Sequence, residues 1–388
     1  MKVVLGVTSS IAAYKIPFLI RALKREGNEV RVVISEKATH FVTPEILTLL
    51  TGNRVIVGND YFLETSSKHI DLSKWGDVLL VAPADFNIIG KAASGIADDI
   101  VTTLIAAFKG SVVFAPAMHD IMWKNPILQE KVRYLKDRGY YFSGPVRGDL
   151  YSGDIGEGRF QEIEYIIEDL YAAYRGFPLK GKKVLLAYGR TEEPIDDVRV
   201  ITNRSTGRMG VFIAKEVKKC GGYLIQVAGK LSIPPYGRDE IVRVNTAFEM
   251  KNAVHENLKH ADILIMAAAV SDFRPQNRLK GKVKREKTKK LNIAFEKTED
   301  ILKSISKLKK ERVFVGFALS DDIEEVAPLK LKEKNLDIIV ANTTSSMESE
   351  KSSGFILTKD GKKVEFENLD KENVASLILK EILAIAKP

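Results

Sequence analysis

Cysteine is almost absent from the sequence, because the 388 residues contain only one, Cys220. A single cysteine can form neither a disulfide within the chain nor a cysteine-based metal cluster. Histidine is also scarce, and its five copies show no HExxH spacing, so no structural metal site is predicted. The histidines that remain as candidates for other chemistry are His40, His69, His119, His255 and His260.

Long hydrophobic runs are absent as well. No stretch approaches the roughly 18 uninterrupted apolar residues of a membrane-spanning helix, so no membrane partner is predicted. The first residues, MKVVLGVTSS, are typical of a short buried strand and not of a secretion signal. With 45% hydrophobic and 29% charged residues, the composition is that of a soluble globular protein, and we expect a cytoplasmic location.

Length and charge narrow the possible functions. A chain of 388 residues is too long for one ordinary hydrophobic core, so two domains of similar size are expected. The net charge of +9 favours anionic ligands such as phosphates. Nucleic acid is not a predicted partner, because no recognised nucleic-acid-binding module is present.

The first half alternates short apolar runs with helical patterns, which predicts a doubly wound α/β domain with a parallel sheet. A first helix is expected over 11–26, and strands over 3–7, 29–34, 77–81 and 112–115. Ligands of such sheets bind beyond the carboxyl ends of the strands. Residues 144–160 contain five glycines and are predicted to form a mobile loop. A turn-rich segment after a helix at 161–174 places the domain boundary near residue 178.

The α/β pattern starts again in the second half. A helix is expected over 208–219, a closing helix over 371–386, and strands over 184–187, 223–228, 263–267, 313–318 and 336–341. Lys359-Asp-Gly between two apolar runs indicates a β-hairpin. The fold class predicted for the whole chain is therefore α/β, with two doubly wound Rossmann-like domains at 1–178 and 179–388 and mostly parallel sheets.

Hydroxyl residues follow Gly6 where the first strand meets the first helix. Gly6 permits a tight turn, while Thr8, Ser9 and Ser10 offer hydroxyl and backbone N–H groups at a helix N-terminus, where an anion is favoured. Simple capping of the helix by serine explains these residues equally well. Because the pattern is not GxGxxG, ordinary dinucleotide binding is not indicated.

Four segments of the first half occur in a specific order: GVTSSIAAYK from Gly6, HIDL at 69–72, APADFNIIGKAASGIADD from Ala82, and PAMHDIMW at 116–123. Together they resemble the homo-oligomeric flavin-containing cysteine decarboxylases over residues 1–175. The resemblance implies a flavodoxin-like domain that binds FMN. It assigns FMN contacts to Gly6, Thr8, Ser9, Ser10, Ser35, Ala84, Asp85, Asn87, Thr102 and Met118.

The same resemblance implies a reaction. His69 matches the family's base, and the flavin oxidises the cysteinyl thiol side chain to a thioaldehyde, which gives the departing CO₂ an electron sink. Two positions depart from the family. His119 stands where an asparagine usually binds the substrate carboxylate, and Ser152 stands where a cysteine donates the final proton. Either Tyr151, His119 or a water replaces that donor, or the reaction is altered.

The second half contains AYGRTEEPIDDVRVITNRSTGRMG at 187–210, AAAVSDFRP at 267–275, GKVKREK at 281–287, VGFA at 315–318 and KLKEKNLDIIVAN at 330–342. These blocks resemble the phosphopantothenate–cysteine ligases of bacteria and archaea over residues 180–388. Such ligases activate 4′-phosphopantothenate with CTP to an acyl-cytidylate, which the amine of L-cysteine attacks. The resemblance implies that Asn203 holds the acyl-cytidylate and Lys282 serves the condensation. It places CTP, with Mg²⁺ at Asp272, on Ala267, Ala268, Asp272, Lys282, Phe317, Lys330 and Lys334.

The run RLKGKVKREKTKK at 278–290 has eight basic residues in 13. A solvated loop, a nucleic-acid patch and a flexible loop that orders over bound nucleotide all explain such a run, and the lack of interleaved aromatics disfavours the second. The sequence thus predicts a bifunctional coenzyme A biosynthesis enzyme, with trimeric packing of the flavin halves and dimeric packing of the ligase halves. The rivals are a ligase fused to a flavin domain with lost decarboxylase turnover, and a non-catalytic flavin-binding subunit.

Overall fold

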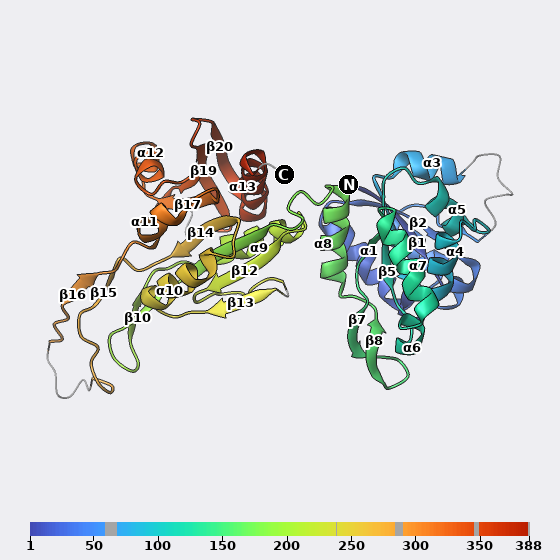
Figure 1. Ribbon diagram of the computed structural model, residues 1–388, viewed down its shortest axis with the longest axis horizontal. Helices are drawn as coiled ribbons and strands as arrows, with labels where there is room; N and C mark the ends of the chain where they lie inside the picture. The colour runs from blue at the N-terminus through green and yellow to red at the C-terminus, as the bar shows by residue number, and fades with distance from the viewer. Residues whose placement is uncertain (59–67, 238, 284–289, 345–348, 387–388) are drawn as a thin grey trace. The chain divides into compact units, whose positions relative to one another are not determined.

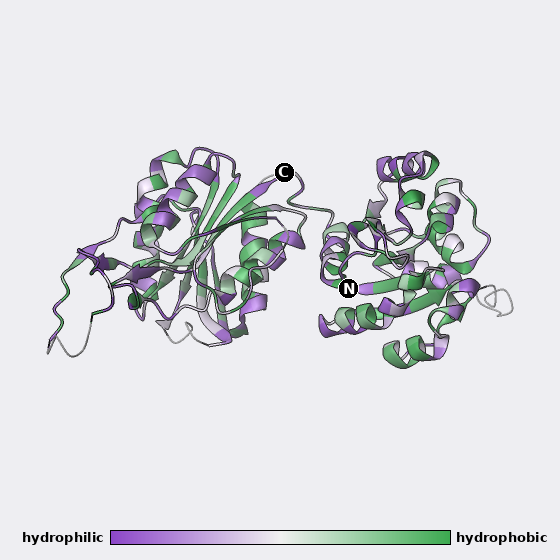
Figure 2. Cartoon of the chain, turned by 90° about the horizontal axis from the view of Figure 1, so that it is seen from below, coloured by the Kyte–Doolittle hydropathy of each residue, from purple (hydrophilic) through white to green (hydrophobic). Residues whose placement is uncertain are grey.

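The computed structural model describes residues 1–58, 68–237, 239–283, 290–344 and 349–386. The chain divides into two compact units, Met1–Phe177 and Pro178–Pro388, each of which has its own sheet (Figure 1). Across the described part of the chain, every helix is too short or too polar to span a membrane. The hydrophobic residues of each unit are concentrated on its strands and on the helix faces against them (Figure 2).

The first unit is built on a six-stranded parallel sheet with the order β3-β2-β1-β4-β5-β6. Its strands are β1 Lys2–Val7, β2 Glu29–Ile34, β3 Ile56–Val57, β4 Val78–Ala84, β5 Ser111–Pro116 and β6 Tyr141–Phe142. Without the two-residue edge strand β3, this is the strand order of flavodoxin. The order reverses between β1 and β4, and such a point is where ligands of doubly wound sheets bind.

Helices cover both faces of this sheet. They are η1 Ile11–Lys15, α1 Ile16–Arg25, η2 Glu36–His40, α2 Pro44–Thr51, α3 Lys68–Trp75, α4 Phe86–Ala93, α5 Ile100–Ala107, α6 Asp120–Trp123, α7 Pro126–Asp137 and α8 Ile163–Tyr174. Side chains of β1 alternate between two cores: Val3 and Leu5 pack with α1, α2 and α8, whereas Val4 packs with α3, α4, α5 and α7.

One sequence prediction in this unit is wrong, and another needs refinement. The helix predicted over 11–26 is present over 11–25, but its first part is the 3₁₀ helix η1, and Pro17 lies in the first turn of α1, where its missing N–H removes no hydrogen bond. The loop expected over 144–160 contains a hairpin of β7 Val146–Asp149 and β8 Ile155–Arg159. A β-carbon on Gly158 would overlap the carbonyl oxygen of Met118, so this glycine provides close approach and not flexibility.

The second unit is built on an eight-stranded sheet with the order β13-β12-β9-β14-β17-β18-β19-β20. Only the pairs β18–β19 and β19–β20 are antiparallel, and the second of these is the predicted hairpin. The strands are β9 Lys183–Arg190, β12 Tyr223–Ala228, β13 Glu240–Arg243, β14 Ile263–Ala269, β17 Val313–Leu319, β18 Ile338–Asn342, β19 Lys351–Thr358 and β20 Lys363–Asp370. The mostly parallel, doubly wound α/β architecture predicted for both halves is thus confirmed.

The helices of the second unit also form two layers. They are α9 Arg208–Lys218, α10 Ala247–Leu258, α11 Ile301–Ile305, η5 Ser306–Leu308, α12 Ile323–Glu333 and α13 Lys371–Ile385. Helices α9 and α13 cover one face, and α10, α11 and α12 cover the other. The single cysteine, Cys220, lies buried in the α9–α13 layer, as expected of a small apolar side chain.

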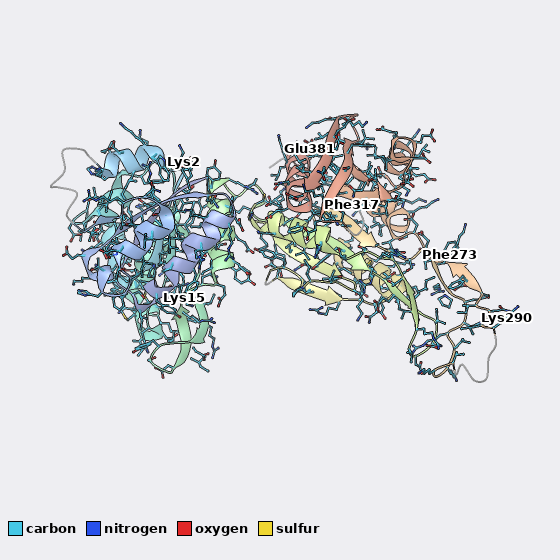
Figure 3. The ribbon with its side chains drawn as sticks, turned by 180° about the vertical axis from the view of Figure 1, so that it is seen from behind. Lys2, Lys15, Phe273, Lys290, Phe317 and Glu381 are labelled. Atoms are coloured by element: carbon cyan, nitrogen blue, oxygen red, sulfur yellow. The ribbon has the colours of Figure 1, made fainter. Side chains whose placement is uncertain are left out.

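A two-part extension projects from this unit (Figure 1). It consists of β10 Glu192–Pro194 paired with β11 Val200–Thr202, and β15 Phe273–Pro275 paired with β16 Phe295–Lys297. Figure 3 shows the labelled Phe273 and Lys290 on this extension and Phe317 in the body of the unit. Its exposed apolar side chains are Val198, Val200, Phe273, Leu291 and Phe295.

Helix α9 lies so close to β9 that Gly210 has no room for a side chain. A β-carbon there would overlap the β-carbon and ring of Tyr188, which is fully buried and donates its hydroxyl to Gln226 Oε1 at 2.8 Å. We expect Gly210→Ala to lower the free energy of unfolding by about 1–3 kcal/mol through overpacking. Thermal and denaturant unfolding measure the loss. Gly90→Ala, in helix α4 with open space around it, is the control and is expected to be neutral or stabilising.

Candidate active sites

Two cavities lie at the carboxyl ends of the strands in the first unit. The larger one, of about 610 Å³, is lined by η1, the residues after β5 and the β7–β8 hairpin. The smaller one, of about 170 Å³, is lined by residues that follow β1, β2 and β4. The larger volume lies within the range of small-molecule sites.

Hydroxyl groups after β1 hold the strand-end loops together. Thr8 donates its Oγ1 to the Pro83 carbonyl at 2.7 Å and accepts the Asp85 amide at 3.2 Å. Ser9 donates to Asp85 Oδ2 at 2.9 Å, and Asp85 also caps α4 through the Ile88 amide at 2.7 Å. Thr8 and Asp85 therefore shape the walls of the smaller cavity, and their own polar atoms are largely satisfied within the protein.

Two further serines differ in whether their hydroxyl groups already have a hydrogen-bond partner within the protein. Ser10 caps η1 and donates to the Ala117 carbonyl at 3.2 Å, so capping is one of its roles. The Ser35 hydroxyl is buried without a hydrogen-bond partner, and its side chain lines the smaller cavity, as does the exposed Asn87. An unpartnered buried hydroxyl costs about 1–3 kcal/mol, which a polar ligand removes. The hydroxyl and phosphate groups of a flavin mononucleotide fit this cavity wall.

His119 and Ser152 meet at a carboxylate beside the larger cavity. Because His119 Nδ1 accepts the Ile121 amide at 3.3 Å, its proton lies on Nε2, which is 3.3 Å from Asp154 Oδ2. Ser152 donates to the same oxygen at 2.9 Å. The hydrogen bond from Ser152, followed by that from His119, lowers the pKa of Asp154 below its ordinary value. Asp154 is thus the common acceptor of the two side chains.

The second unit has one cavity of about 370 Å³ beside the point where its strand order reverses, between β9 and β14. It is lined by the residues that precede and open α9, by the ends of β14 and β17, and by Asn203, Asp272, Phe317, Lys330, Asn342, Ser352 and Lys371. An adjoining cavity of about 220 Å³ shares Ala268, Asp272, Phe317 and Lys330 with it and adds Lys334. The N-terminus of α9, whose cap Gly207 makes no side-chain hydrogen bond, favours an anion.

Asn203 follows β11 and is fixed by two backbone acceptors. Its Nδ2 donates to the carbonyls of Ala269 and Val270, at 3.2 and 3.1 Å. Both carbonyls belong to the end of β14 and the loop after it, so they set the position of the amide group. Since the nitrogen is used in this way, the Asn203 Oδ1 is left as the group that can accept a ligand hydrogen bond.

Charged side chains surround the same cavities. Lys334 Nζ lies 2.8 Å from Asp300 Oδ2, whereas Lys330 lines both cavities and forms no ion pair within the described part of the chain. Asp272 is exposed and also lines both. Among the described residues there is no cluster of three or more His, Cys, Asp or Glu side chains that could hold a metal ion by themselves. A cation at Asp272 would therefore need ligands from a bound substrate.

A buried lysine at the cavity wall is the least expected feature. Lys371 begins α13, is 6% exposed and lines the cavity with Arg208. Burial is the main cause that lowers the pKa of Lys371, and the nearby Arg208 guanidinium lowers it further. Arg208 also pairs with the exposed Glu350 at 3.4 Å, and the two cations at the cavity wall suit an anionic ligand.

Comparison with known proteins agrees with this division of sites. Residues 1–174 match the family described as flavoprotein, and residues 179–385 match the DNA/pantothenate metabolism flavoprotein C-terminal domain. The coenzyme A biosynthesis bifunctional protein CoaBC of Bacillus subtilis is 38% identical over 99% of this chain and 97% of that protein. The CoaBC protein of Escherichia coli is 36% identical over 98% of this chain and 96% of its own length.

This chain belongs to the CoaBC family.

A solved C-terminal domain of a CoaBC protein is 35% identical and covers 54% of this chain and 97% of its own, with a TM-score of 0.47. The enzyme class and the bifunctional organisation predicted from the sequence are confirmed by the full-length CoaBC relatives. The flavoprotein match supports the predicted flavin cofactor.

The CoaBC chain brings most of the predicted site residues to these cavities. The smaller cavity of the first unit gathers Thr8, Ser9, Ser35, Asp85 and Asn87, and the larger one gathers Ser10, Met118, His119 and Ser152. The two adjoining cavities at the ends of β14 and β17 gather Asn203, Ala267, Ala268, Asp272, Phe317, Lys330 and Lys334. These placements leave the chemical roles of the residues as predictions.

Other predicted residues lie outside the cavities. Gly6, Ala84 and Thr102 are buried and line neither cavity of the first unit, and Thr102 forms a capping box with Asp99. His69 is the second residue of α3 and lines neither cavity. Lys282 is exposed on the extension and lines neither of the two adjoining cavities at the ends of β14 and β17. Residues 284–289 of the basic run lie outside the described residues, so its predicted closure over nucleotide stays a prediction.

Sequence reasoning missed several residues of these sites. Asp154, Lys371 and Asn342 were not singled out, although the first joins Ser152 to His119 and the other two line the ligase cavity. Asp154 is only two residues from Ser152 in the sequence, and this proximity could have indicated that it belongs to the same site. Lys371 and Asn342 lie over a hundred residues from the STGR segment, and only strand pairing brings them beside it.

Proposed function

We propose that the second unit joins 4′-phosphopantothenate to L-cysteine with CTP, through an acyl-cytidylate. We further propose that the first unit uses FMN to decarboxylate the product, 4′-phosphopantothenoylcysteine, to 4′-phosphopantetheine. The observation that carries this proposal is the ligase cavity, where Asn203, Asp272 and Lys330 lie beside the N-terminus of α9. Cations and a helix N-terminus suit the phosphates of a nucleoside triphosphate. A carboxylic acid must be activated by such a nucleotide before an amine can attack it.

Each group of the ligase cavity has a proposed task. Asn203 Oδ1 accepts a hydrogen bond from the acyl-cytidylate, because its amide nitrogen is already held by the end of β14. Lys330 neutralises phosphate oxygens as a point charge, and Asp272 would hold a Mg²⁺ ion, which would neutralise further charge on the triphosphate. Lys282 assists the attack of the cysteine amine.

In the flavin unit, bound FMN would supply the oxidation of the thiol side chain that creates an electron sink for loss of CO₂, and the reduction that restores the thiol. The residues of the chain bind and orient the substrate and move its protons. His69 is the proposed base, and the His119–Asp154–Ser152 group beside the larger cavity is proposed to face the substrate carboxylate and thiol. In this role His119 donates its Nε2 proton to the substrate carboxylate in place of Asp154.

We propose that the enzyme is a homo-oligomer, with trimers of flavin units and dimers of ligase units. The exposed apolar side chains of the ligase extension, among them Val198, Phe273 and Phe295, support an interface there. His69 lines neither of the two cavities described in its own unit, so an oligomer gives it a way to reach the site of a neighbouring copy. Light scattering of the purified protein measures the predicted mass.

Product analysis tests the whole proposal. The purified protein is given 4′-phosphopantothenate, L-cysteine and each nucleoside triphosphate in turn, and products are followed by mass spectrometry and pyrophosphate release. We expect pyrophosphate and phosphopantothenoylcysteine with CTP, followed by a loss of 44 mass units as CO₂ leaves. A colourless protein that releases no pyrophosphate would contradict both halves of the proposal.

The buried cation of the ligase cavity gives a second test. We expect Lys371→Gln to raise the KM for CTP or for 4′-phosphopantothenate about tenfold, because one charge-assisted contact to an anion contributes roughly 1.5–3 kcal/mol. The substrate whose KM rises identifies the anion that Lys371 contacts. Lys380→Gln, an exposed lysine of the same helix, is the control and should leave both values unchanged. Equal KM values for the Lys371→Gln variant and the unmodified protein would exclude the contact.

A further inference from the structure

The backbone on both sides of Lys282 is held by the turn between β10 and β11. The Gly281 amide donates to Asp197 Oδ2 at 3.1 Å, and the Val283 amide donates to Asp196 Oδ2 at 3.2 Å. The Val283 carbonyl in turn accepts from Arg199 Nη2 at 3.3 Å. The lysine side chain is therefore exposed, while its two neighbours in the chain are fixed at three points.

The two carboxylates of this turn differ in burial. Asp196 is 2% exposed, and its oxygens accept the Val198 and Arg199 amides and the Arg199 guanidinium in addition to the Val283 amide. The Asp197 side chain is 52% exposed and pairs with Arg278 at 2.8 Å. The hydrogen bond from the Val198 amide, with those of Arg199 and Val283, holds the pKa of Asp196 at about 2, so it is ionised at neutral pH. Asp196 is the buried centre of the turn.

The same turn leads directly to the ligase cavity. β11 begins at Val200 and ends at Thr202, and the next residue, Asn203, lines the cavity. The Thr202 hydroxyl donates to the Thr191 carbonyl at 2.6 Å, which fixes the other end of this short hairpin. A single hydrogen-bonded frame thus connects the segment that carries Lys282 with the strand that delivers Asn203.

We propose that Asp196 is a positioning residue for the ligase reaction, which acts by holding the backbone at Val283 so that Lys282 keeps a fixed place relative to Asn203. This inference rests on the proposed function of the second unit. Asp196 touches no substrate and acts only through Lys282. Its loss should therefore slow the step that uses Lys282 and spare the binding of nucleotide, because Lys330, Lys334 and the N-terminus of α9, which are proposed to hold the nucleotide, lie on other elements.

The variant Asp196→Asn tests this role with little change in shape. Its amide group keeps one oxygen, but the NH₂ that replaces the other cannot accept the Val283 amide and opposes the Arg199 guanidinium. We expect condensation with L-cysteine to slow about 10–100-fold, since a small displacement of a reacting group costs about that much. Pyrophosphate release without cysteine, and the KM for CTP, should stay within about twofold.

A double-mutant cycle separates positioning from general stability. In the Lys282→Ala background, Asp196→Asn should cause no further loss of condensation, because the residue through which it acts is gone. Trypsin provides a readout that needs no activity: cleavage after Lys280 and Lys282, followed by peptide mass spectrometry, should be several times faster in Asp196→Asn. Asp360→Asn, in the turn of the β19–β20 hairpin, is the control with the same change of charge and should match the unmodified protein.

The possible outcomes are distinct. Condensation that proceeds at the original rate in Asp196→Asn overturns the proposal, as does an equal slowing of both half-reactions with a lowered melting temperature. Additive losses in the double variant overturn it as well, because Asp196 would then act independently of Lys282. If the unmodified protein releases no pyrophosphate with CTP, the proposed function fails, and the tryptic cleavage rates alone decide whether Asp196 holds the segment.

Discussion

Replacement of Lys282 by alanine is expected to slow phosphopantothenoylcysteine formation by about 10²–10³-fold, the loss that follows removal of one charged group from a developing transition state. Activation of the acid should continue, because the cavity that holds Asn203, Asp272 and Lys330 does not include Lys282. The acyl-cytidylate should therefore accumulate. Single-turnover experiments with radiolabelled CTP, quenched and analysed by mass spectrometry, measure both steps.

The neighbouring lysine provides the control for this experiment. Lys280 is exposed, lies two residues away and carries the same charge, so Lys280→Ala should keep at least half of the original condensation rate. A similar loss in both variants would mean that the basic run acts through its summed charge and not through one positioned ammonium group. Salt dependence would then be strong for both, because summed surface charge is screened.

Replacement of His69 by asparagine is expected to lower the rate of CO₂ release by about 10²–10⁴-fold, the usual contribution of a general base. Asparagine keeps a polar side chain of similar size but cannot take up a proton at neutral pH. Flavin should stay bound, because His69 lines neither cavity of the flavin unit. The measurements are the absorption spectrum of the purified protein and the release of labelled CO₂ from phosphopantothenoylcysteine.

A histidine of the other unit serves as the matched variant. His260 is exposed, and His260→Asn should decarboxylate at the original rate. Retention of ligation in His69→Asn would show that the chain is folded and that only the flavin unit has lost activity. A normal rate of CO₂ release with bound flavin would assign the base to another group, and the His119–Asp154 pair is then the next one to replace.

Much of the fold was predictable because strands and helices depend on local patterns. Continuous apolar runs such as Val3–Val7 indicated buried parallel strands, and their alternation with amphipathic helices indicated a doubly wound sheet. The loop predicted over 144–160 was wrong because a glycine-rich composition is compatible with two different structures. Glycines at 144–160 indicated flexibility, but Gly158 lies in a strand that passes against the Met118 carbonyl. Sequence alone cannot distinguish a glycine that bends from one that permits close approach.

Candidate site residues were predictable where they follow a strand, because parallel strands present their carboxyl ends at one edge of the sheet. Thr8, Asp85 and Met118 follow three different strands and line two neighbouring cavities. Their hydrogen bonds were not predictable, and these show that Thr8 and Asp85 support loops as well as face a ligand. Asp196 was not found from the sequence, since its burial depends on contacts with Val283, which is 87 residues away.

The sequence by itself determined the α/β class, the two-part organisation and the motifs that characterise the CoaBC family, because these depend on residue type, spacing and order. Tertiary structure alone decided which of those residues share a cavity. It placed Lys371 beside Arg208 and left His69 and Lys282 outside the cavities of their own units. The physical reason is that strand order and loop contacts, which join residues far apart in the chain, set the distances between side chains.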